Sequence, residues 1–464
     1  MPGAGQVKAP VVERLSDRIA IGVLTSTYPP VLVDQVVAEA GRREERQRLL
    51  PARVVVWLVL AMALFSGQAY EEVARLLAGG LGWARRWRQW WRVPSTPAIV
   101  KARARLGPEP LELLFRRSVG PLATEETRGA WYRGLRVLSL DGTTLDVPDT
   151  PANAAAFGRP PSSRGEQAAF PQVRLLAVAE CGTHAIIQAT IGPLTSGEVT
   201  LAPQVFGVLG PGVLLLADRG FAGFGLWRQA TATGAALVWR TKTNAVLPVV
   251  QPLADGSYLS QIVAASDHRH RRDPITVRVV EYTLGKDRGR SATPAPYRLV
   301  TSILDPRKAP AAELAALYHQ RWEFETALDE LKTHQRGPGV VLRSRSPDMV
   351  TQELWGMLLV HHAIRRLMHQ AALAVDVDPD RLSFTRSLRI VRRQVTTTGQ
   401  AAFPPEPTAR PWPGCPTRSP SSCCPSGGCG PSRGWSSARC PALASSAPST
   451  GPGRSRPFPR PPRS

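Results

Sequence analysis

The strongest constraint on the fold is a series of short apolar runs between residues 131 and 304. Short apolar runs bounded by turn-forming residues are typical of buried strands. A helix-like segment over residues 225–233 separates two of the later runs. Strands first, followed by strand–helix alternation, predict an α/β fold with a mixed sheet. The predicted strands cover residues 135–140, 173–179, 184–191, 212–217, 235–240, 275–282 and 297–304.

Two of these runs are followed at once by an aspartate. Asp141 follows the run over 135–140, and Asp218 follows the run over 212–217. A carboxylate at the carboxyl end of a strand projects from a rigid support toward a crevice. Two such carboxylates on neighbouring strands could share a hard cation such as Mg²⁺. Taken singly, however, each aspartate is more readily explained as part of a turn.

A long amphipathic helix is predicted over residues 309–334. At ~100° per residue, offsets of three, seven and fourteen residues place four side chains within about 60° of one another. These are Tyr318, Arg321, Glu325 and Lys332. An adjacent apolar stripe would anchor the helix to a core, so that it presents a carboxylate, two cations and a phenol at the edge of a crevice. The same spacing also suits a solvated face with ion pairs such as Arg321–Glu325.

The charge of the chain points to a polyanionic partner. Its 464 residues carry a formal net charge of +22, and arginines, which bind phosphate in a forked geometry, outnumber lysines. A GC-rich coding bias explains the arginine excess equally well. The apolar run over residues 54–65 is shorter than the ~20 residues that span a bilayer, and residues 1–10 lack the apolar core of a signal peptide. We therefore expect a cytoplasmic protein without a membrane partner.

The two ends of the chain differ from its middle. Residues 14–130 are predicted to form a helical domain. Within it, residues 83–92 interleave four arginines with four tryptophans, which suits nucleic-acid contact and equally a packing seam. Residues 397–464 are rich in Pro, Ser and Arg without an apolar period, which predicts a disordered tail. Eight Arg and one Glu after residue 400 account for seven positive charges, which leaves +15 for residues 1–400.

These motifs resemble those of the DDE transposases of bacterial insertion sequences, of the insertion-element-four type. The family signature Y-x-x-R-x-x-x-E-x-x-x-x-x-x-K is matched from Tyr318 to Lys332. The surroundings of the two aspartates also match, as Leu-Ser-Leu-Asp141-Gly-Thr and Leu-Ala-Asp218-Arg-Gly-Phe. The resemblance covers residues 14–400 approximately. It implies an α/β, RNase H-like catalytic core with a β-rich insertion, a helical N-terminal domain and a disordered C-terminal tail. The implied core covers residues 131–396 and the insertion about 245–296.

The resemblance also implies the chemistry. Asp141, Asp218 and Glu325 would be the catalytic residues and would bind two Mg²⁺ ions, with Mn²⁺ as a substitute. Two such ions activate the attacking water or 3′-hydroxyl and stabilise the leaving oxygen. The expected reaction is cleavage at the terminal inverted repeats of an insertion sequence, followed by joining to target DNA. The expected partners are double-stranded DNA, at the transposon ends and the target, and a second copy of the chain in a homodimer at the bacterial nucleoid.

Four further residues are expected to contact DNA. Arg321 and Lys332 share a helix face with Glu325, where they would hold phosphates near the transposon end. Tyr318 would hydrogen-bond a phosphate. Tyr297 stands where some relatives place a tryptophan, so we expect it to stack on a flipped base.

Two other interpretations stay open at this point. The tail reads like an out-of-frame translation of GC-rich DNA, so the chain is alternatively a catalytically impaired, DNA-binding transposase remnant. A cellular RNase H-like nuclease would share the same motifs. Among neighbouring residues, Glu330 lies within reach of the site but lacks the family match, and His361 and His362 are expected at a helix surface.

Overall fold

The computed structural model describes most of the chain up to residue 397. The predicted tryptophan–arginine cluster at 83–92 and the tail beyond residue 397 lie outside the described residues. The same holds for the last part of the predicted insertion, residues 284–296. The described residues are 24, 27–46, 48–79, 93–161, 168–267, 270–283, 297–337 and 341–397.

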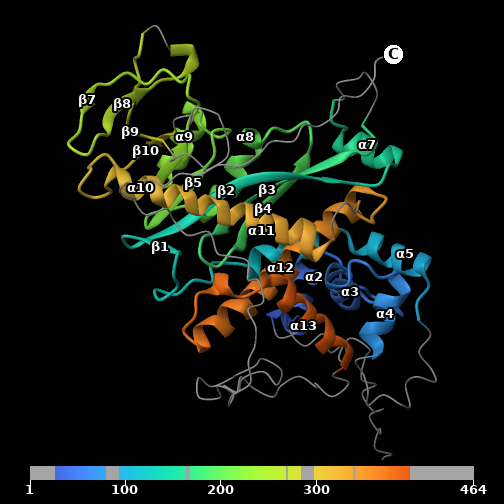
Figure 1. Cartoon of the computed structure of the whole chain (residues 1–464). Coiled ribbons are helices and arrows are strands. Elements are labelled where there is room, and N and C mark those ends of the chain that lie inside the picture. Colours follow the sequence, from blue (N-terminus) through green and yellow to red (C-terminus); the bar gives the residue numbers. More distant parts are fainter. Residues whose placement is uncertain are drawn as a thin grey trace, which may run out of the picture. The chain divides into compact units, whose positions relative to one another are not determined.

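A large mixed sheet lies at the centre of the described structure (Figure 1). Its strands are β1 (Trp131–Tyr132), β2 (Leu135–Asp146), β3 (Gln172–Glu180), β4 (Ala185–Pro193), β5 (Val213–Ala217), β6 (Ala236–Arg240), β7 (Gln251–Pro252), β8 (Tyr258–Ile262), β9 (Ile275–Tyr282) and β10 (Tyr297–Thr301). They follow the order β4-β3-β2-β5-β6-β10-β9-β8-β7, with β1 paired to β2. Strands β2, β3 and β4 are antiparallel, whereas β5 and β6 run parallel to β2.

The predicted α/β fold with a mixed sheet is confirmed. Three antiparallel strands, followed by two strands parallel to the first, form the RNase H-like core that the resemblance implies. Strands β7, β8 and β9 come from the residues predicted as an insertion. They extend the same sheet beyond β6, because β10 pairs with β6 on one side and with β9 on the other.

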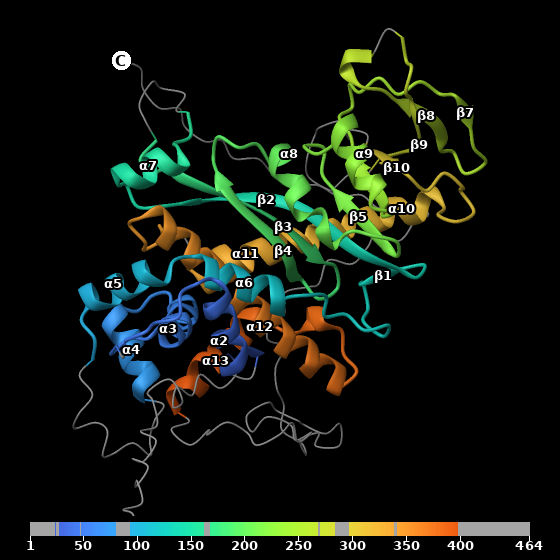
Figure 2. The same cartoon turned by 180° about the vertical axis from the view of Figure 1, so that it is seen from behind.

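Helices cover both faces of the sheet (Figures 1 and 2). Helices α10 and α11 cross one face, where α11 packs on β2 and β3, and α9 covers the other face at β6. The helices are α2 (Pro30–Glu39), α3 (Ala52–Leu64), α4 (Tyr70–Gly79), α5 (Thr96–Leu106), α6 (Glu109–Ser118), α7 (Pro151–Phe157), α8 (Glu198–Leu201), α9 (Phe224–Ala232), α10 (Ala311–Tyr318), α11 (Trp322–Asp329), α12 (Pro347–Ala374) and α13 (Phe384–Thr397).

The N-terminal helices and the sheet share one apolar core. Every residue of α3 except Arg53 is buried, as expected of a helix that is apolar on all sides. Helix α3 packs on α12, and the same core continues to the β2–β4 part of the sheet through residues such as Leu145 and Leu175. The long helix α12 therefore has the N-terminal helices on one side and strand β4 on another.

The predicted helix over residues 309–334 is helical, but it is not one regular α-helix. Helix α10 leads into a short 3₁₀ turn, η4 (His319–Arg321), and α11 leads into a π-helix, η5 (Glu330–Gln335). A π-helix widens the turn, and such segments frequently occur at functional sites. The change falls between Glu325 and Lys332, so the two side chains are not spaced as on an ideal α-helix.

Candidate active site

Asp141 and Asp218 lie at one level of the sheet. Strand β2 continues to Asp146, so Asp141 lies inside the strand and not after its end as expected. The parallel pairing of β2 with β5 nevertheless ends at Leu140 and Ala217, and the two aspartates are the next residues after this pair. The Asp141 carboxylate faces Arg321, which precedes α11, and the charge of Asp218 acts on both Asp141 and Tyr318 of α10.

The Asp141 carboxyl resists ionisation. Its side chain is 21% exposed, and its pKa is raised to about 6, chiefly by burial and in smaller part by the negative charges of Asp218 and Glu198. The backbone N–H of Gly142, which donates to Oδ1 at 2.8 Å, and the guanidinium of Arg321 oppose this shift. Negative charge that its surroundings do not fully compensate is what a bound cation would stabilise.

Arg321 links Asp141 to Glu325. Its Nη1 donates to Oδ2 of Asp141 at 3.0 Å, and its Nη2 donates to Oε1 of Glu325 at 2.9 Å. The Arg321 side chain is 10% exposed, whereas that of Glu325 is 45% exposed. The guanidinium thus lies between two carboxylates and is largely shielded from solvent. A side chain free to bind phosphate would be open to solvent instead. The structure brings both carboxylates and this cation into one contact set.

The other two residues of the predicted helix face also contact the sheet. Tyr318 is 2% exposed, and its hydroxyl donates to the carbonyl oxygen of Ala217 at 3.3 Å. In this arrangement the hydroxyl is buried and fixes the end of α10 to the residue before Asp218, and the expected phosphate contact stays a prediction. Lys332 donates from Nζ to Oγ1 of Thr143 at 2.8 Å. Thr143 lies two residues after Asp141 on the same strand, so its side chain points to the same face of the sheet. This alternation is the sequence signal that could have predicted the contact between Thr143 and Lys332.

Tyr297 lies in an aromatic cluster beside the site. Its ring stacks on Tyr282 with the centroids 5.4 Å apart, and the guanidinium of Arg240 lies 4.2 Å from its centroid. His319 lies 6.1 Å from Tyr297, centroid to centroid, and directly follows Tyr318 in the chain. The cluster is therefore joined to the carboxylates through η4, without Tyr297 itself belonging to the Arg321 contact set.

Glu198 is a neighbour of the site that the sequence motifs did not reveal. It accepts a hydrogen bond from Nη1 of Arg174 at 2.9 Å and packs over the α-carbon of Gly142. A Cβ added at Gly142 would lie 2.6 Å from Oε1 of Glu198, so a larger residue here would displace the Glu198 side chain. Glu198 begins a short helix after Gly197, and nothing in that local sequence marks it as close to Asp141.

Glu330, at the start of the π-helix, is buried and contacts residues of α12, away from the carboxylates of the site. It is 5% exposed and accepts a hydrogen bond from Nε of Arg365 at 2.8 Å, and its Oε2 lies 3.2 Å from Nε2 of His361. Burial alone would raise the pKa of Glu330, but His361 and Arg365 hold it below its ordinary value. His361 and His362, expected at a helix surface, are 0% and 1% exposed because α12 is packed on several sides.

The oxygen donors of this site suit a hard divalent cation. Asp141 and Asp218 are close enough for their charges to interact, and carboxylate oxygens are preferred ligands of Mg²⁺. Within the described ranges, no group of three or more His, Cys, Asp or Glu side chains is arranged to hold a metal ion. Glu325 is bound to Arg321 instead. Asp141 and Glu325 would each have to release Arg321 before they could hold a metal ion together with Asp218.

Comparisons with known proteins identify the family. The family model described as insertion element 4 transposase N-terminal matches residues 18–116, and the transposase DDE domain matches residues 132–362. The chain is 30% identical over 382 residues to "Transposase InsG for insertion sequence element IS4" of Escherichia coli (strain K12), covering 81% of this chain and 83% of InsG. The chain belongs to the insertion-element-four family of DDE transposases.

Two further similarities were found. The transposase is 27% identical over 176 residues to "Putative transposase InsZ" of Escherichia coli (strain K12), covering 38% of the chain and 56% of InsZ. A cryo-EM structure of the piggyBac transposase synaptic complex with hairpin DNA aligns with a TM-score of 0.45 at 10% identity, covering 83% of this chain and 82% of that one.

The predicted function as a DNA transposase is confirmed. Family membership makes the chain an enzyme that binds DNA, cleaves it and transfers strands, and it implies dependence on a divalent metal ion. In the part of the transposase that the structure describes, no helix is long and apolar enough to cross a membrane.

Proposed function

We propose that Asp141, Asp218 and Glu325 are the catalytic carboxylates of this transposase and that they bind two Mg²⁺ ions, with Mn²⁺ as a substitute. The observation that carries the proposal is the alignment of the two aspartates at the end of the β2–β5 pairing, with Glu325 joined to Asp141 through Arg321. When bound, the ions would activate the attacking oxygen and stabilise the leaving oxygen of the phosphodiester.

Arg321 pairs with two carboxylates and offsets their negative charges, which would otherwise repel each other. Its position at the centre of the site is also where a scissile phosphate has to approach. We infer that Arg321 exchanges its carboxylate partners for a DNA phosphate, which a forked guanidinium binds well. Lys332, held beside Asp141 by Thr143, would contact a neighbouring phosphate.

The aromatic residues have separate proposed roles. Tyr318 would fix the end of α10 to the sheet through its buried hydrogen bond to Ala217, and so position Arg321, three residues later, beside Asp141. Tyr297 is half-buried and has a cation over its ring, which suits stacking with a base turned out of the duplex at the transposon end.

We propose that residues 14–130 bind the terminal inverted repeats and that residues 131–396 carry out cleavage and joining to target DNA. The N-terminal family match ends at residue 116 and the DDE-domain match begins at residue 132, which supports this division. The shared core of α3, α12 and the sheet would hold the two parts in a fixed relation. A homodimer would hold two DNA ends together, in the bacterial cytoplasm at the nucleoid.

Glu325→Gln tests the catalytic assignment. The substitution removes a charge at an exposed side chain while keeping its size, so the fold should persist. Cleavage of terminal-repeat DNA with Mg²⁺ should fall by about a thousandfold or more, the equivalent of several kcal/mol, while binding to the repeats is retained. Asp329→Asn, an exposed acid on the same helix, is the matched control and should cleave normally. Cleavage at the wild-type rate by Glu325→Gln would contradict the assignment.

A further inference from the structure

A cavity of about 480 Å³ lies beside the start of helix α3. Its walls come from residues 41–46 and 48, between α2 and α3, and from α5. Val55 and Leu106 contribute apolar surface to it. The volume lies in the range of pockets that hold a group of roughly nucleotide size.

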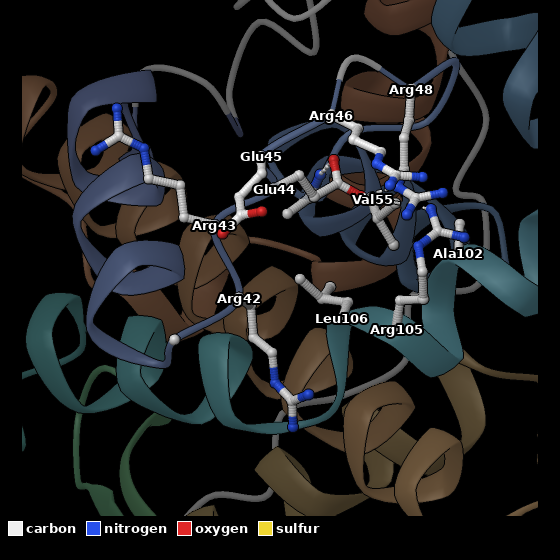
Figure 3. A pocket seen from close by; sticks show the side chains of 12 residues that line it. Arg42, Arg43, Glu44, Glu45, Arg46, Arg48, Val55, Ala102, Arg105 and Leu106 are labelled. Atoms are coloured by element: carbon white, nitrogen blue, oxygen red, sulfur yellow. Dashed lines mark hydrogen bonds and ion pairs between the residues drawn. The ribbon is translucent and has the colours of Figure 1, made fainter.

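Three arginines gather on one side of this cavity (Figure 3). The guanidinium groups of Arg46, Arg48 and Arg105 come together there, whereas Arg43, on the same loop, points away over α2. Arg42 also points elsewhere and pairs with Glu109 at 3.2 Å. The positive charge of the cavity is therefore concentrated in one place.

A single carboxylate lies among these three arginines. Glu44 accepts a hydrogen bond from the backbone N of Ala52, at the start of α3, at 3.2 Å. Its Oε1 lies 3.4 Å from Nε of Arg48 and 3.5 Å from Nη2 of Arg105, which is beyond the usual hydrogen-bond length. Against Glu44, the three arginines leave an excess of two positive charges, and the second carboxylate that lines the cavity, Glu45, lies beside Arg43 (Figure 3). Arg46 has no hydrogen bond or ion pair with any residue that the structure describes.

We propose that this cavity binds one phosphate of a DNA backbone through Arg46, Arg48 and Arg105, with the adjoining sugar against the apolar wall. The proposal rests on the DNA-binding role proposed for residues 14–130. Guanidinium groups bind phosphate oxygens in a forked geometry and are favoured wherever a phosphate is recognised. A cationic side next to an apolar wall matches the alternation of phosphate and sugar along one strand.

A double variant, Arg46→Gln/Arg48→Gln, tests the proposal in the full-length transposase. The probe is a fluorescein-labelled DNA duplex of random sequence, because phosphate contacts do not depend on base sequence. Affinity is measured by anisotropy between about 50 and 200 mM NaCl. Binding should weaken about tenfold at the lowest salt. The slope of log K against log salt should decrease by about one, as expected for one lost phosphate contact.

Arg43→Gln is the matched control for the single variant Arg46→Gln, since each removes one charge from the same loop and Arg43 points away from the cavity. It should keep the wild-type slope. The single Arg46→Gln tests the same claim without disturbing Glu44, and it should give a smaller loss in the same direction. Equal affinity and slope in the double variant and the wild type would overturn the proposal. So would a loss in Arg43→Gln equal to that in the single Arg46→Gln, which would indicate general charge attraction only.

The two proposals fail separately. If the double variant binds like the wild type while Glu325→Gln loses cleavage, only the phosphate cavity is refuted. If Glu325→Gln cleaves normally while the double variant loses affinity, only the catalytic assignment is refuted.

Discussion

Removing the Asp141 charge should stabilise the metal-free transposase. The folded protein holds this carboxyl in a partly buried site next to Asp218 and Glu198, and its pKa is raised from 3.8 to about 6, chiefly by burial. Asp141→Asn keeps the size of the side chain but stays neutral at every pH. The variant therefore avoids the cost of an ionised carboxylate in this site.

The expected size of the effect follows from the shift in pKa. A shift of about two units corresponds to about 3 kcal/mol, at ~1.4 kcal/mol for each unit. The folded protein binds this proton more tightly than the unfolded chain does. Stability of the wild type is therefore lost as the pH rises from about 4 to 6, and the full cost applies above that window. The advantage of Asp141→Asn should be about half as large at pH 5 as at pH 8.

Urea unfolding in EDTA, at pH 5 and at pH 8, measures this difference. A divalent cation added at pH 8 should stabilise the wild type and not Asp141→Asn, because only the wild type offers the charged ligand. Asp146→Asn, at the end of the same strand, is the control and should not reproduce the pH-dependent gain. Equal or lower stability of Asp141→Asn at pH 8 would refute the reasoning.

Three further substitutions probe the surroundings of the site. Gly142→Ala should lower the free energy of unfolding by no more than about 1 kcal/mol, because the Glu198 side chain can move aside, and Glu198→Ala in the same chain should restore it in thermal unfolding. Glu330→Gln should cost about 3 kcal/mol in urea unfolding, because Arg365 is left with a buried charge, and an unchanged midpoint would argue against this. Tyr297→Ala should reduce cleavage of hairpin-forming DNA ends in a gel assay, and an unchanged rate would exclude stacking.

Much of the fold could be predicted from the sequence because its buried strands and helices are strongly apolar. Strand β9 has the predicted bounds, Ile275–Tyr282, and helix α9 covers Phe224–Ala232, where a helix over 225–233 was predicted. Both aspartates could be found because each follows an apolar run. The two runs form strands β2 and β5, which pair in parallel. These signals are local, and they need no knowledge of how distant segments pack.

Other features depend on distant contacts that a sequence pattern does not show. Strand β2 extends past Asp141 because β3 pairs with it as far as Asp146, although the polar Thr143 and Thr144 hide the strand signal. The buried state of His361 depends on which elements surround α12, and a helical pattern alone cannot specify that.

The position of Arg321 is the clearest example at the site. Its spacing from Glu325 was visible on the helix, and its second bond, to Asp141, required the packing of α11 on β2. Sequence reasoning therefore placed the cation near the carboxylate but did not show that it bridges two of them.

The most direct test of the proposed site is anomalous diffraction from Mn²⁺ in crystals of the transposase with cleaved transposon-end DNA. Mn²⁺ should give peaks with oxygen ligands from Asp141, Asp218 and Glu325, and Arg321 should have left both acids for a DNA phosphate. Mn²⁺ bound elsewhere, or Glu325 still paired with Arg321 while the aspartates hold the metal, would contradict a shared three-carboxylate site.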